Sequence, residues 1–425
     1  MNISHTLIGK KLLILGANPE TVPLIETAKK MGVCVLVTDN DPQAFAKPFA
    51  NKSFNVDGMD VDGLVRLAQQ ENIDGVLVGV ADRLILPYFE VCDALGLPCY
   101  ATRDQCEYFT NKQKFNELCL KYNIKTIPNY NNEFNKKNSL LLIHYPVFVK
   151  PTDANSGKGM SICHNEYDLK IAVEKAKSFS KTNGFLIERY MQCDDMFIYY
   201  TFKDSEVFVS AIADRFTSDK QGDVSRVCIG ANYPSKFIDL YFHTLHQNIT
   251  QLFKDLKVQN GVFMISAFVE NEEIYLYDPG FRLQGEAPNI PIEAVCGFDQ
   301  KSMLVNFALT GSMGEIDLNN LNNPYFKNIF ATTIWFLAKE GEIGEIKGIE
   351  NLENDPCVIK IIQRLFVGDK VTKEMIGTEA QVFARMYLTS KSKNEVLHKV
   401  KYYQNKIQVF NSNKSQMLLG EADLK

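Results

Sequence analysis

Apolar and polar positions along the first hundred residues alternate between two periods. Short apolar runs such as KLLIL and VCVLV are typical of strands that are buried on both faces of a parallel sheet. The segments between them, such as TVPLIETAKKMG and VDGLVRLAQQ, repeat apolar residues three and four positions apart, as an amphipathic helix does. This rhythm predicts βαβ units and an α/β domain over residues 1–110.

After residue 110 the pattern becomes that of an α+β unit. A helix is predicted from about Asn111, followed by the strand YPVFVK and by strands that helices over 166–180 and 235–256 interrupt. The segment ENEE at 270–273 lies between VFMISAFV and IYLYD, and this alternation of apolar residues on both sides predicts a β-hairpin. We assign residues 111–312 to a second domain.

Residues 313–425 predict a small C-terminal α+β lobe. Short strands are expected around TIWFLAKEGEIGEIKGI, a helix from about Pro356, a strand at QVFARMYL and a final helix at NEVLHKVKYYQNKI. The chain carries no visible repeat and no long linker, so the three units are expected to pack as one body.

The composition is that of an ordinary globular protein, with 45% hydrophobic and 23% charged residues in 425. A formal charge of -5 argues against a broad nucleic-acid footprint or a polybasic membrane surface. The start lacks the apolar run of a secretory signal, and no stretch of about 18 apolar residues occurs. A cytoplasmic protein acting on small molecules, with no nucleic acid or membrane as partner, is therefore expected.

Cysteine and histidine patterns exclude several kinds of site. The ten cysteines form no CxxC pair and no zinc-ligand spacing, so we interpret them as reduced packing residues. The six histidines are dispersed, and neither a Ser/His/Asp pattern nor HExxH stands out. The loop GANP at 16–19 could offer backbone N–H groups to an anion, but it is not GxGxxG. A plain strand-to-helix turn is favoured there, and NAD binding is not proposed.

Two lysines have positions that suit an anionic ligand. Lys150 closes the apolar strand YPVFVK, where desolvating an ammonium is costly unless an anion meets it. Lys112 begins a helix in TNKQKF. The small-residue loop over 153–159, which contains Ser156 and Gly157, could fold its N–H groups over phosphates, or it could be a mobile hairpin loop with a solvated lysine.

Four residues around the strand FLIERYM fit the recognition of a nucleoside. An acid can accept a hydrogen bond from the exocyclic amine of the base, and backbone groups one to three residues later can form hydrogen bonds with the base edge. A second acid can accept from the ribose hydroxyls. These roles fall on Glu188, Arg189, Met191 and Asp195. Taken singly, the same residues would be ordinary surface charges.

The end of the predicted hairpin carries a third group of charges. In YLYDPGFRLQGEAP, Asp278 and Glu286 bracket Arg282 after an apolar strand. Arginine can grip a carboxylate or an acyl phosphate with two parallel hydrogen bonds, and carboxylates bind Mg²⁺. The alternative is a surface cluster of ion pairs.

In this order and spacing, the residues resemble the ATP-grasp superfamily, particularly the branch of biotin carboxylase, the carbamoyl phosphate synthetase large subunit and the L-amino-acid ligases. The resemblance covers nearly the whole chain and implies a Rossmann-like pre-ATP-grasp domain over 1–110, an ATP-grasp domain of two α+β lobes over 111–312 and the C-terminal lobe. It implies phosphate contacts from Lys112, Lys150 and the 153–159 loop, adenine and ribose contacts from Glu188 and Asp195, Mg²⁺ at Asp278 and a substrate oxyanion at Arg282. RLQGEAP is similar to a run of biotin carboxylase, which marks Gln284 and Glu286 as second-substrate or base positions.

The sequence departs from the family at two positions. The acid that usually stands twelve residues before the strand-end acid is Ser266, and the usual asparagine two residues after it is Gly280. Asp278 is therefore the only matched metal carboxylate, with Glu286 as a substitute, and the number of metal ions is left open.

The resemblance implies an ATP- and Mg²⁺-dependent ligase that activates a small-molecule carboxylate as an acyl phosphate and passes it to an amine or another nucleophile. The oligomeric state is left open, with a homodimer as one alternative. Ser266 motivates a second hypothesis, a catalytically weak module whose ATP occupancy regulates a partner.

Overall fold

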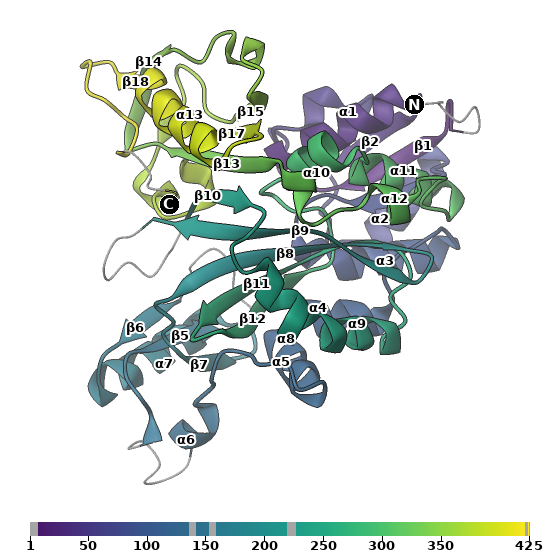
Figure 1. Cartoon of the computed structure of the whole chain (residues 1–425). Helices are drawn as coiled ribbons and strands as arrows, with labels where there is room; N and C mark the ends of the chain where they lie inside the picture. Colours follow the sequence, from purple (N-terminus) through teal and green to yellow (C-terminus); the bar gives the residue numbers. More distant parts are fainter. Residues whose placement is uncertain (1–6, 136–141, 153–158, 219–226, 421–423, 425) are drawn as a thin grey trace.

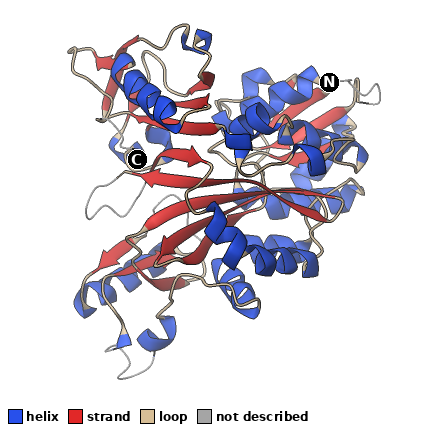
Figure 2. Cartoon of the chain, in the orientation of Figure 1, coloured by secondary structure: helices blue, strands red, loops and turns tan. Residues whose placement is uncertain are grey.

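A computed structural model of the chain describes residues 7–135, 142–152, 159–218, 227–420 and 424 (Figure 1). Figure 2 shows helices and strands mixed throughout, as the α/β and α+β prediction requires. The described part has no helix long and apolar enough to cross a bilayer.

The N-terminal domain is built on a parallel sheet with the strand order β3-β2-β1-β4. The burial of KLLIL and CVLVT confirms that both faces of the central strands are covered. Asn111 caps the helix Lys112–Lys121 through the N–H groups of Gln113 and Lys114. The elements are β1 (Lys11–Leu15), η1 (Pro19–Thr21), α1 (Val22–Lys30), β2 (Cys34–Thr38), η2 (Lys47–Phe49), β3 (Lys52–Phe54), α2 (Val61–Glu71), β4 (Gly75–Val78), η3 (Asp82–Leu84), α3 (Ile85–Leu95), α4 (Arg103–Thr110) and α5 (Lys112–Lys121).

A small antiparallel sheet with the order β6-β5-β7 lies at the lower left of Figure 1. Helix α7 packs its apolar stripe on one face of this sheet and forms a separate core with it. The predicted helix over 166–180 is confirmed, and Asn165 caps it through the N–H of Asp168. The elements are α6 (Asn131–Asn135), β5 (Val147–Pro151), β6 (Ser161–Cys163), α7 (Glu166–Phe179) and β7 (Phe185–Arg189).

An eight-stranded sheet with the order β12-β11-β8-β9-β10-β13-β17-β15 crosses the molecule. The predicted hairpin is confirmed: β11 and β12 pair antiparallel, and the turn residues Asn271 and Glu272 have φ of 50° and 61°, as a tight hairpin turn requires. Its first five strands along the chain are β8 (Asp194–Lys203), β9 (Glu206–Thr217), β10 (Cys228–Tyr233), β11 (Gly261–Glu270) and β12 (Glu273–Gly280).

Helices cover this sheet and link it to the N-terminal domain. The helix predicted over 235–256 is two helices, because the chain breaks the helical conformation at Leu245. The cover helices are α8 (Ile238–Thr244), α9 (His246–Asp255), α10 (Asn289–Cys296), α11 (Gln300–Thr310) and α12 (Leu318–Leu321).

The C-terminal strands extend the same large sheet, since β13 pairs with β10 and with β17. The predicted strand at QVFARMYL and the predicted final helix are confirmed. The prediction of a helix from about Pro356 is wrong. Residues 358–363 form β15, which pairs with β17. The sequence VIKIIQ is rich in β-branched residues, and a free sheet edge gives it a partner.

The remaining elements form a three-stranded sheet, β16-β14-β18, and short helical turns beside it. Helix α13 packs beside β13 and β17 (Figure 1). The C-terminal elements are η5 (Phe326–Asn328), β13 (Phe330–Leu337), β14 (Gly341–Lys347), η6 (Leu352–Asn354), β15 (Val358–Gln363), β16 (Lys370–Val371), η7 (Lys373–Met375), η8 (Glu379–Gln381), β17 (Val382–Ser390), α13 (Lys393–Lys406) and β18 (Gln408–Asn411).

Candidate active site

A buried ion pair joins two strands of the small sheet. Lys150 on β5 is 10% exposed, and its Nζ lies 2.6 Å from Oε2 of Glu188 on β7, which is 5% exposed. The strand register places both side chains on the same face, and α7 covers the other face. Taking both charges out of water is costly, so further polar partners on this face would be stabilising. The pair can offer a cation to an anion and an acceptor to an amine.

Other candidates for nucleotide contacts are only partly located. Lys112 is the first residue of α5 and is half-buried. Among the described residues it forms no hydrogen bond or ion pair with another candidate. Ser156 and Gly157 lie outside the described residues. Met191 is buried in the turn after β7.

Arg189 ties the small sheet to the large one. It ends β7, and its Nη2 pairs with Oε2 of Glu270 at the end of β11. The hydrogen bond to the Glu270 carboxylate raises the pKa of Arg189, which remains a cation. The pair thus links the two sheets at this edge.

Asp195 on β8 belongs to a buried polar network on the large sheet. Nη1 of Arg215 donates to its Oδ2 at 3.0 Å, and the hydroxyl of Tyr277 donates to its Oδ1 at 2.9 Å. Burial, followed by the Asp195 carboxylate, raises the pKa of Tyr277 well above its usual value, so the hydroxyl keeps its proton and donates. Two donors therefore hold Asp195 in one orientation.

A β-bulge presents Asp278 at the end of β12. The ladder pairs Ser266 with Tyr277 and Ile265 with Pro279, so Asp278 is an extra residue between two paired ones. Its φ is 48°, in the left-handed region, and its side chain is exposed. The bulge thus turns the carboxylate out of the ladder.

The Arg282 guanidinium, whose side chain is 12% exposed, is held from two sides. Its Nη2 pairs with Oδ2 of Asp82, the first residue of η3. Its Nη1 donates to the carbonyl of Leu283 at 2.8 Å and to Oε1 of Gln284 at 3.1 Å. Within the described residues its buried Nε has no hydrogen-bond partner. Arg282 is therefore held in one orientation, and its Nε–H is a donor that the described residues do not use.

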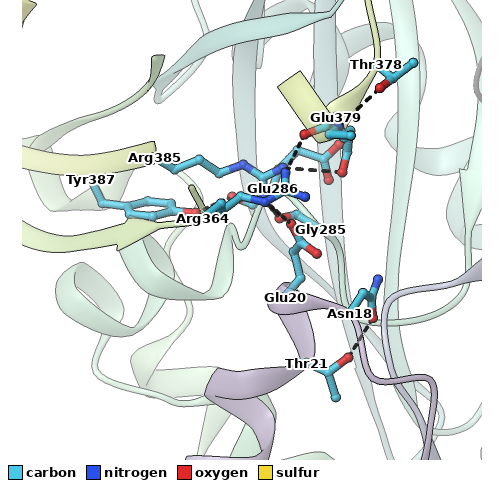
Figure 3. Close-up of polar contacts among 11 residues, drawn as sticks. Asn18, Glu20, Thr21, Gly285, Glu286, Arg364, Thr378, Glu379, Arg385 and Tyr387 are labelled. Carbon is cyan, nitrogen blue, oxygen red and sulfur yellow. Dashed lines mark hydrogen bonds and ion pairs between the residues drawn. The ribbon is translucent and has the colours of Figure 1, made fainter. Parts of the chain in front are cut away.

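Arg385 connects three parts of the chain in one buried cluster (Figure 3). The side chain lies on β17, is 1% exposed and stacks on Trp335 with 4.0 Å from Cζ to the ring centroid. Nη1 donates to the carbonyl of Gly285 and lies 3.3 Å from Oε1 of Glu20, while Nη2 lies 3.4 Å from Oε2 of Glu379. The C-terminal lobe thereby holds both η1 and the loop after Arg282.

A second arginine and a tyrosine complete this cluster. Arg364, just after β15, has its Nε 3.3 Å from Oε1 of Glu20, and its Nη1 donates to the carbonyl of Glu379 at 2.7 Å. The hydroxyl of Tyr387 donates to the carbonyl of Glu286 at 2.9 Å. Figure 3 shows Arg364, Arg385 and Tyr387 reaching from one side toward Glu20 and the 285–286 backbone.

The Glu286 carboxyl is partly buried among charges of both signs. Burial, followed by the nearby Glu379 carboxylate, raises its pKa above the usual glutamate value, while Arg385 and Arg282 act in the opposite direction. A carboxylate whose pKa is raised is a stronger base than an ordinary carboxylate, so it can accept a proton and return it.

The candidates Glu286 and Asp278 both lie within electrostatic reach of Arg282, since after Asp82 their carboxylates also raise the pKa of this arginine. The residues that sequence reasoning missed are Asp82, Glu20, Arg364, Glu379 and Arg385. A usable signal existed for Arg385, because it stands inside the apolar strand VFARMYL, as Lys150 stands at the end of YPVFVK.

Metal donors at this centre are few. Ser266, at the position of the missing acid, is buried, and its hydroxyl faces Sδ of Met264 at 3.6 Å. Across the part of the chain that the structure describes, no three His, Cys, Asp or Glu side chains gather as a metal site. Mg²⁺ is commonly bound through one or two carboxylates plus substrate phosphates, and the exposed Asp278 fits that arrangement.

Comparison with known sequences matches parts of the chain. The family described as D-ala D-ala ligase C-terminus matches residues 122–220. A formate-dependent phosphoribosylglycinamide formyltransferase of Prochlorococcus marinus is 28% identical over 208 residues, which are 48% of this chain and 53% of that protein. A carbamoyl phosphate synthase large chain of Methanosphaerula palustris is 25% identical over 205 residues, 43% of this chain and 19% of that protein. The chain thus spans about half or less of the length of these relatives.

Solved structures match nearly the whole chain. The L-amino acid ligase of Bacillus licheniformis superposes with a TM-score of 0.78 at 14% identity, covering 96% of this chain and 100% of that one. The biotin carboxylase domain of the 2-oxoglutarate carboxylase of Hydrogenobacter thermophilus, crystallised with MgADP and bicarbonate, gives 0.76 at 13% identity and covers 96% and 91%. Phosphoribosylglycinamide synthetase of Anaerococcus prevotii gives 0.74 at 17% identity and covers 95% and 100%.

The fold is therefore that of the ATP-grasp enzymes. The matched family is an ATP-grasp domain, and the resemblance expected from the sequence is confirmed.

Proposed function

We propose that the protein is an ATP-dependent, ADP-forming ligase that activates a carboxylate as an acyl phosphate and transfers it to an amine. The observation that carries this proposal is the buried Arg282 guanidinium, oriented by Asp82 and Gln284 and within electrostatic reach of the Glu286 and Asp278 carboxylates. A structural ion pair does not require an arginine with an unused donor. An oriented arginine with such a donor suits the binding of a carboxylate or an acyl phosphate.

ATP would lie between the small sheet and the end of the large one. Binding of ATP would separate the ion pair of Lys150 and Glu188. Lys150 would then contact the phosphates, and Glu188 would accept a hydrogen bond from the adenine amine. Asp195, already oriented by Arg215 and Tyr277, would accept from the ribose. The other residues assigned to this nucleotide are Lys112, Ser156, Gly157, Arg189 and Met191.

Asp278 would bind the Mg²⁺ that accompanies ATP, and the metal would supply charge neutralisation on the phosphates. Replacing Asp278 by asparagine, which tolerates the left-handed φ of 48°, keeps the backbone while removing the charge. We expect the Mg²⁺ concentration for half-maximal activity to rise by at least about tenfold, the lower end of the loss seen when even an indirect partner of a metal ligand is removed. The Mg²⁺ titration of Asp204→Asn, on an exposed turn, should match that of the wild type. A wild-type titration for Asp278→Asn would place the metal elsewhere.

Glu286 would serve as the base that takes a proton from the attacking amine. Because Glu379 is the largest charged cause of its raised pKa, Glu379→Gln should lower that pKa and shift the acidic limb of kcat/KM to lower pH. Glu340→Gln, exposed before β14, should leave the limb in place. A limb that stays fixed in Glu379→Gln, or moves to higher pH, would remove Glu286 from this role.

Residues 1–110, 111–312 and 313–425 would act as pre-ATP-grasp domain, ATP-grasp domain and C-terminal lobe. Each supplies a part of the proposed centre: Asp82 and Glu20 from the first, Arg282 and Glu286 from the second, and Arg364 and Arg385 from the third. The second hypothesis, a weak ATP-binding regulatory module, gains no support from relatives that are named as ligases and synthetases.

The proposal is tested by measuring ADP release with Mg·ATP against a panel of carboxylates, each with and without a panel of amines. A ligase gives ADP only with a cognate carboxylate and faster release with the cognate amine. ADP release that is the same with every addition, at the level of buffer alone, would contradict the proposal.

A further inference from the structure

A small cavity adjoins the Arg282 side chain. Its volume is about 10 Å³, close to the least that can hold a water molecule, so a guest can place only a single oxygen or an atom of similar size in it. The polar part of the lining is Tyr199 from β8, Arg282 and Gln284 from the loop after β12, Asn289 from α10 and Gln300 from α11. The rest of the lining is apolar.

Three of these residues carry a buried polar atom that has no hydrogen-bond partner among the described residues. The atoms are Nε of Arg282, Nδ2 of Asn289 and the hydroxyl oxygen of Tyr199. Tyr199 is 2% exposed and Asn289 is 4% exposed, so bulk water does not pair with these groups. Unpaired buried polar groups are rare and costly, and three around one cavity indicate a binding site for a guest that accepts hydrogen bonds.

The two glutamines of the lining are already engaged. Nε2 of Gln284 donates to the carbonyls of Gly280 at 3.0 Å and of Arg282 at 2.6 Å, and its Oε1 accepts from Nη1 of Arg282 at 3.1 Å. Nε2 of Gln300 donates to Oγ1 of Thr201 at 2.8 Å. The donors left for a guest are therefore the three unpaired groups.

The local charge favours an anionic guest. Arg282 carries a positive charge, and none of the described residues that line the cavity is an aspartate or a glutamate. Asn289 and Gln300 are the first residues of α10 and α11, so the positive ends of two helix dipoles lie at the same cavity. A protonated amine would face the arginine charge and two N–H groups, whereas a carboxylate oxygen could accept hydrogen bonds from all three donors.

The guest would reach this cavity past Arg282. Of the three residues with an unpaired group, Arg282 is half-buried while Tyr199 and Asn289 are buried, so the arginine forms the outer wall. Because there is room for one oxygen only, the rest of the ligand must stay on the outer side of this wall. The size of the cavity thus selects a chemical group and leaves the remainder of the molecule free to vary.

We propose that Tyr199 and Asn289 form, with Nε of Arg282, a subsite for one oxygen of the carboxylate substrate, so that the acid and not the amine is held at this cavity. This inference rests on the proposed function, because it assigns two further binding residues to the same ligase site. Both residues contact the unreacting oxygen and neither transfers a proton, so they set the affinity for the acid.

Replacing Tyr199 by phenylalanine tests the subsite in the whole protein. The change removes one hydroxyl group that has no partner among the described residues, so folding should be retained. With the carboxylate that supports ADP release, KM for the carboxylate should rise roughly ten- to hundredfold, the loss that follows removal of a hydrogen bond to a charged group. The kcat and the KM for ATP should stay near the wild-type values. Asn289→Leu, of similar size, should show the same separation.

Tyr200→Phe is the matched control. Tyr200 is the next residue of β8, its side chain points to the other face of the sheet, and its hydroxyl lies 3.0 Å from that of Tyr241. Its KM for the carboxylate should equal that of the wild type. An unchanged KM in Tyr199→Phe, or an equal rise in Tyr200→Phe, would overturn the subsite.

A crystal structure of the wild type grown in sodium acetate tests the same site without turnover. The expected result is one acetate oxygen within about 3.2 Å of both Nε of Arg282 and Nδ2 of Asn289. Water in the cavity of these crystals would overturn the subsite. Acetate there, together with an unchanged KM in Tyr199→Phe, would identify an adventitious additive only and would overturn it as well. If no carboxylate supports ADP release, the proposed function fails, while the acetate structure still decides whether the cavity binds a carboxylate.

Discussion

Replacing Arg282 by lysine is expected to lower turnover roughly 100- to 1000-fold, the loss that follows removal of one oriented donor from a reacting oxyanion. Lysine keeps the positive charge near Asp82, but an ammonium cannot reproduce the planar grip that Nη1 and Nη2 now share between Gln284 and Asp82. ATP affinity, measured by calorimetry, should stay near the wild-type value because the proposed nucleotide contacts come from other segments of the chain.

Arg83→Lys is the matched control, since Arg83 is exposed beside Asp82. Its turnover should equal that of the wild type. If Arg282→Lys also turns over normally, the guanidinium has only a structural role and the carboxylate is held elsewhere.

Replacing Lys150 by methionine is expected to have the largest effect on stability. The change leaves the Glu188 carboxylate buried without its partner, which costs about 3–5 kcal/mol in typical cases. The free energy of unfolding from urea titration should fall accordingly at neutral pH. ATP affinity should also fall, by roughly ten- to hundredfold, if a charge-assisted phosphate contact is lost.

The double variant Lys150→Met with Glu188→Leu separates these two effects. Removing both charges from a buried site is often neutral for stability, so the double variant should regain most of the lost free energy of unfolding. Its ATP affinity should remain low, because the phosphate cation and the proposed adenine acceptor are both absent. Recovery of ATP affinity together with stability would mean that the pair acts only in folding.

Local pattern was sufficient for most of the fold. The hairpin around ENEE could be predicted because alternating apolar residues and turn chemistry are both local, and the parallel N-terminal strands could be predicted from their apolar runs. The strand β15 was expected as a helix from Pro356, although the β-branched residues of VIKIIQ favour a strand, and its pairing with β17 decides the outcome.

Part of the candidate site could likewise be predicted from local sequence, and part depends on contacts between distant segments. Asp278 and Arg282 could be found because they are near in sequence and follow one strand. The bulge at Asp278 depends on the register with β11, and the partner of Arg282 is Asp82, 200 positions away in the chain. The ion pairs of Arg385 with Glu20 and Glu379 likewise depend on packing between distant segments. Such contacts leave no periodic signal in the sequence.

The central claim is that the protein converts its carboxylate substrate to an acyl phosphate at the end of β12. Transfer of ¹⁸O from the carboxylate to phosphate tests this claim most directly. The carboxylate that supports ADP release is labelled with ¹⁸O in both oxygens and turned over with unlabelled Mg·ATP and the cognate amine. Attack of the carboxylate on the γ-phosphorus predicts one ¹⁸O in each phosphate released, measured by mass spectrometry. Phosphate without ¹⁸O, in a reaction that still consumes ATP and carboxylate, would contradict the account.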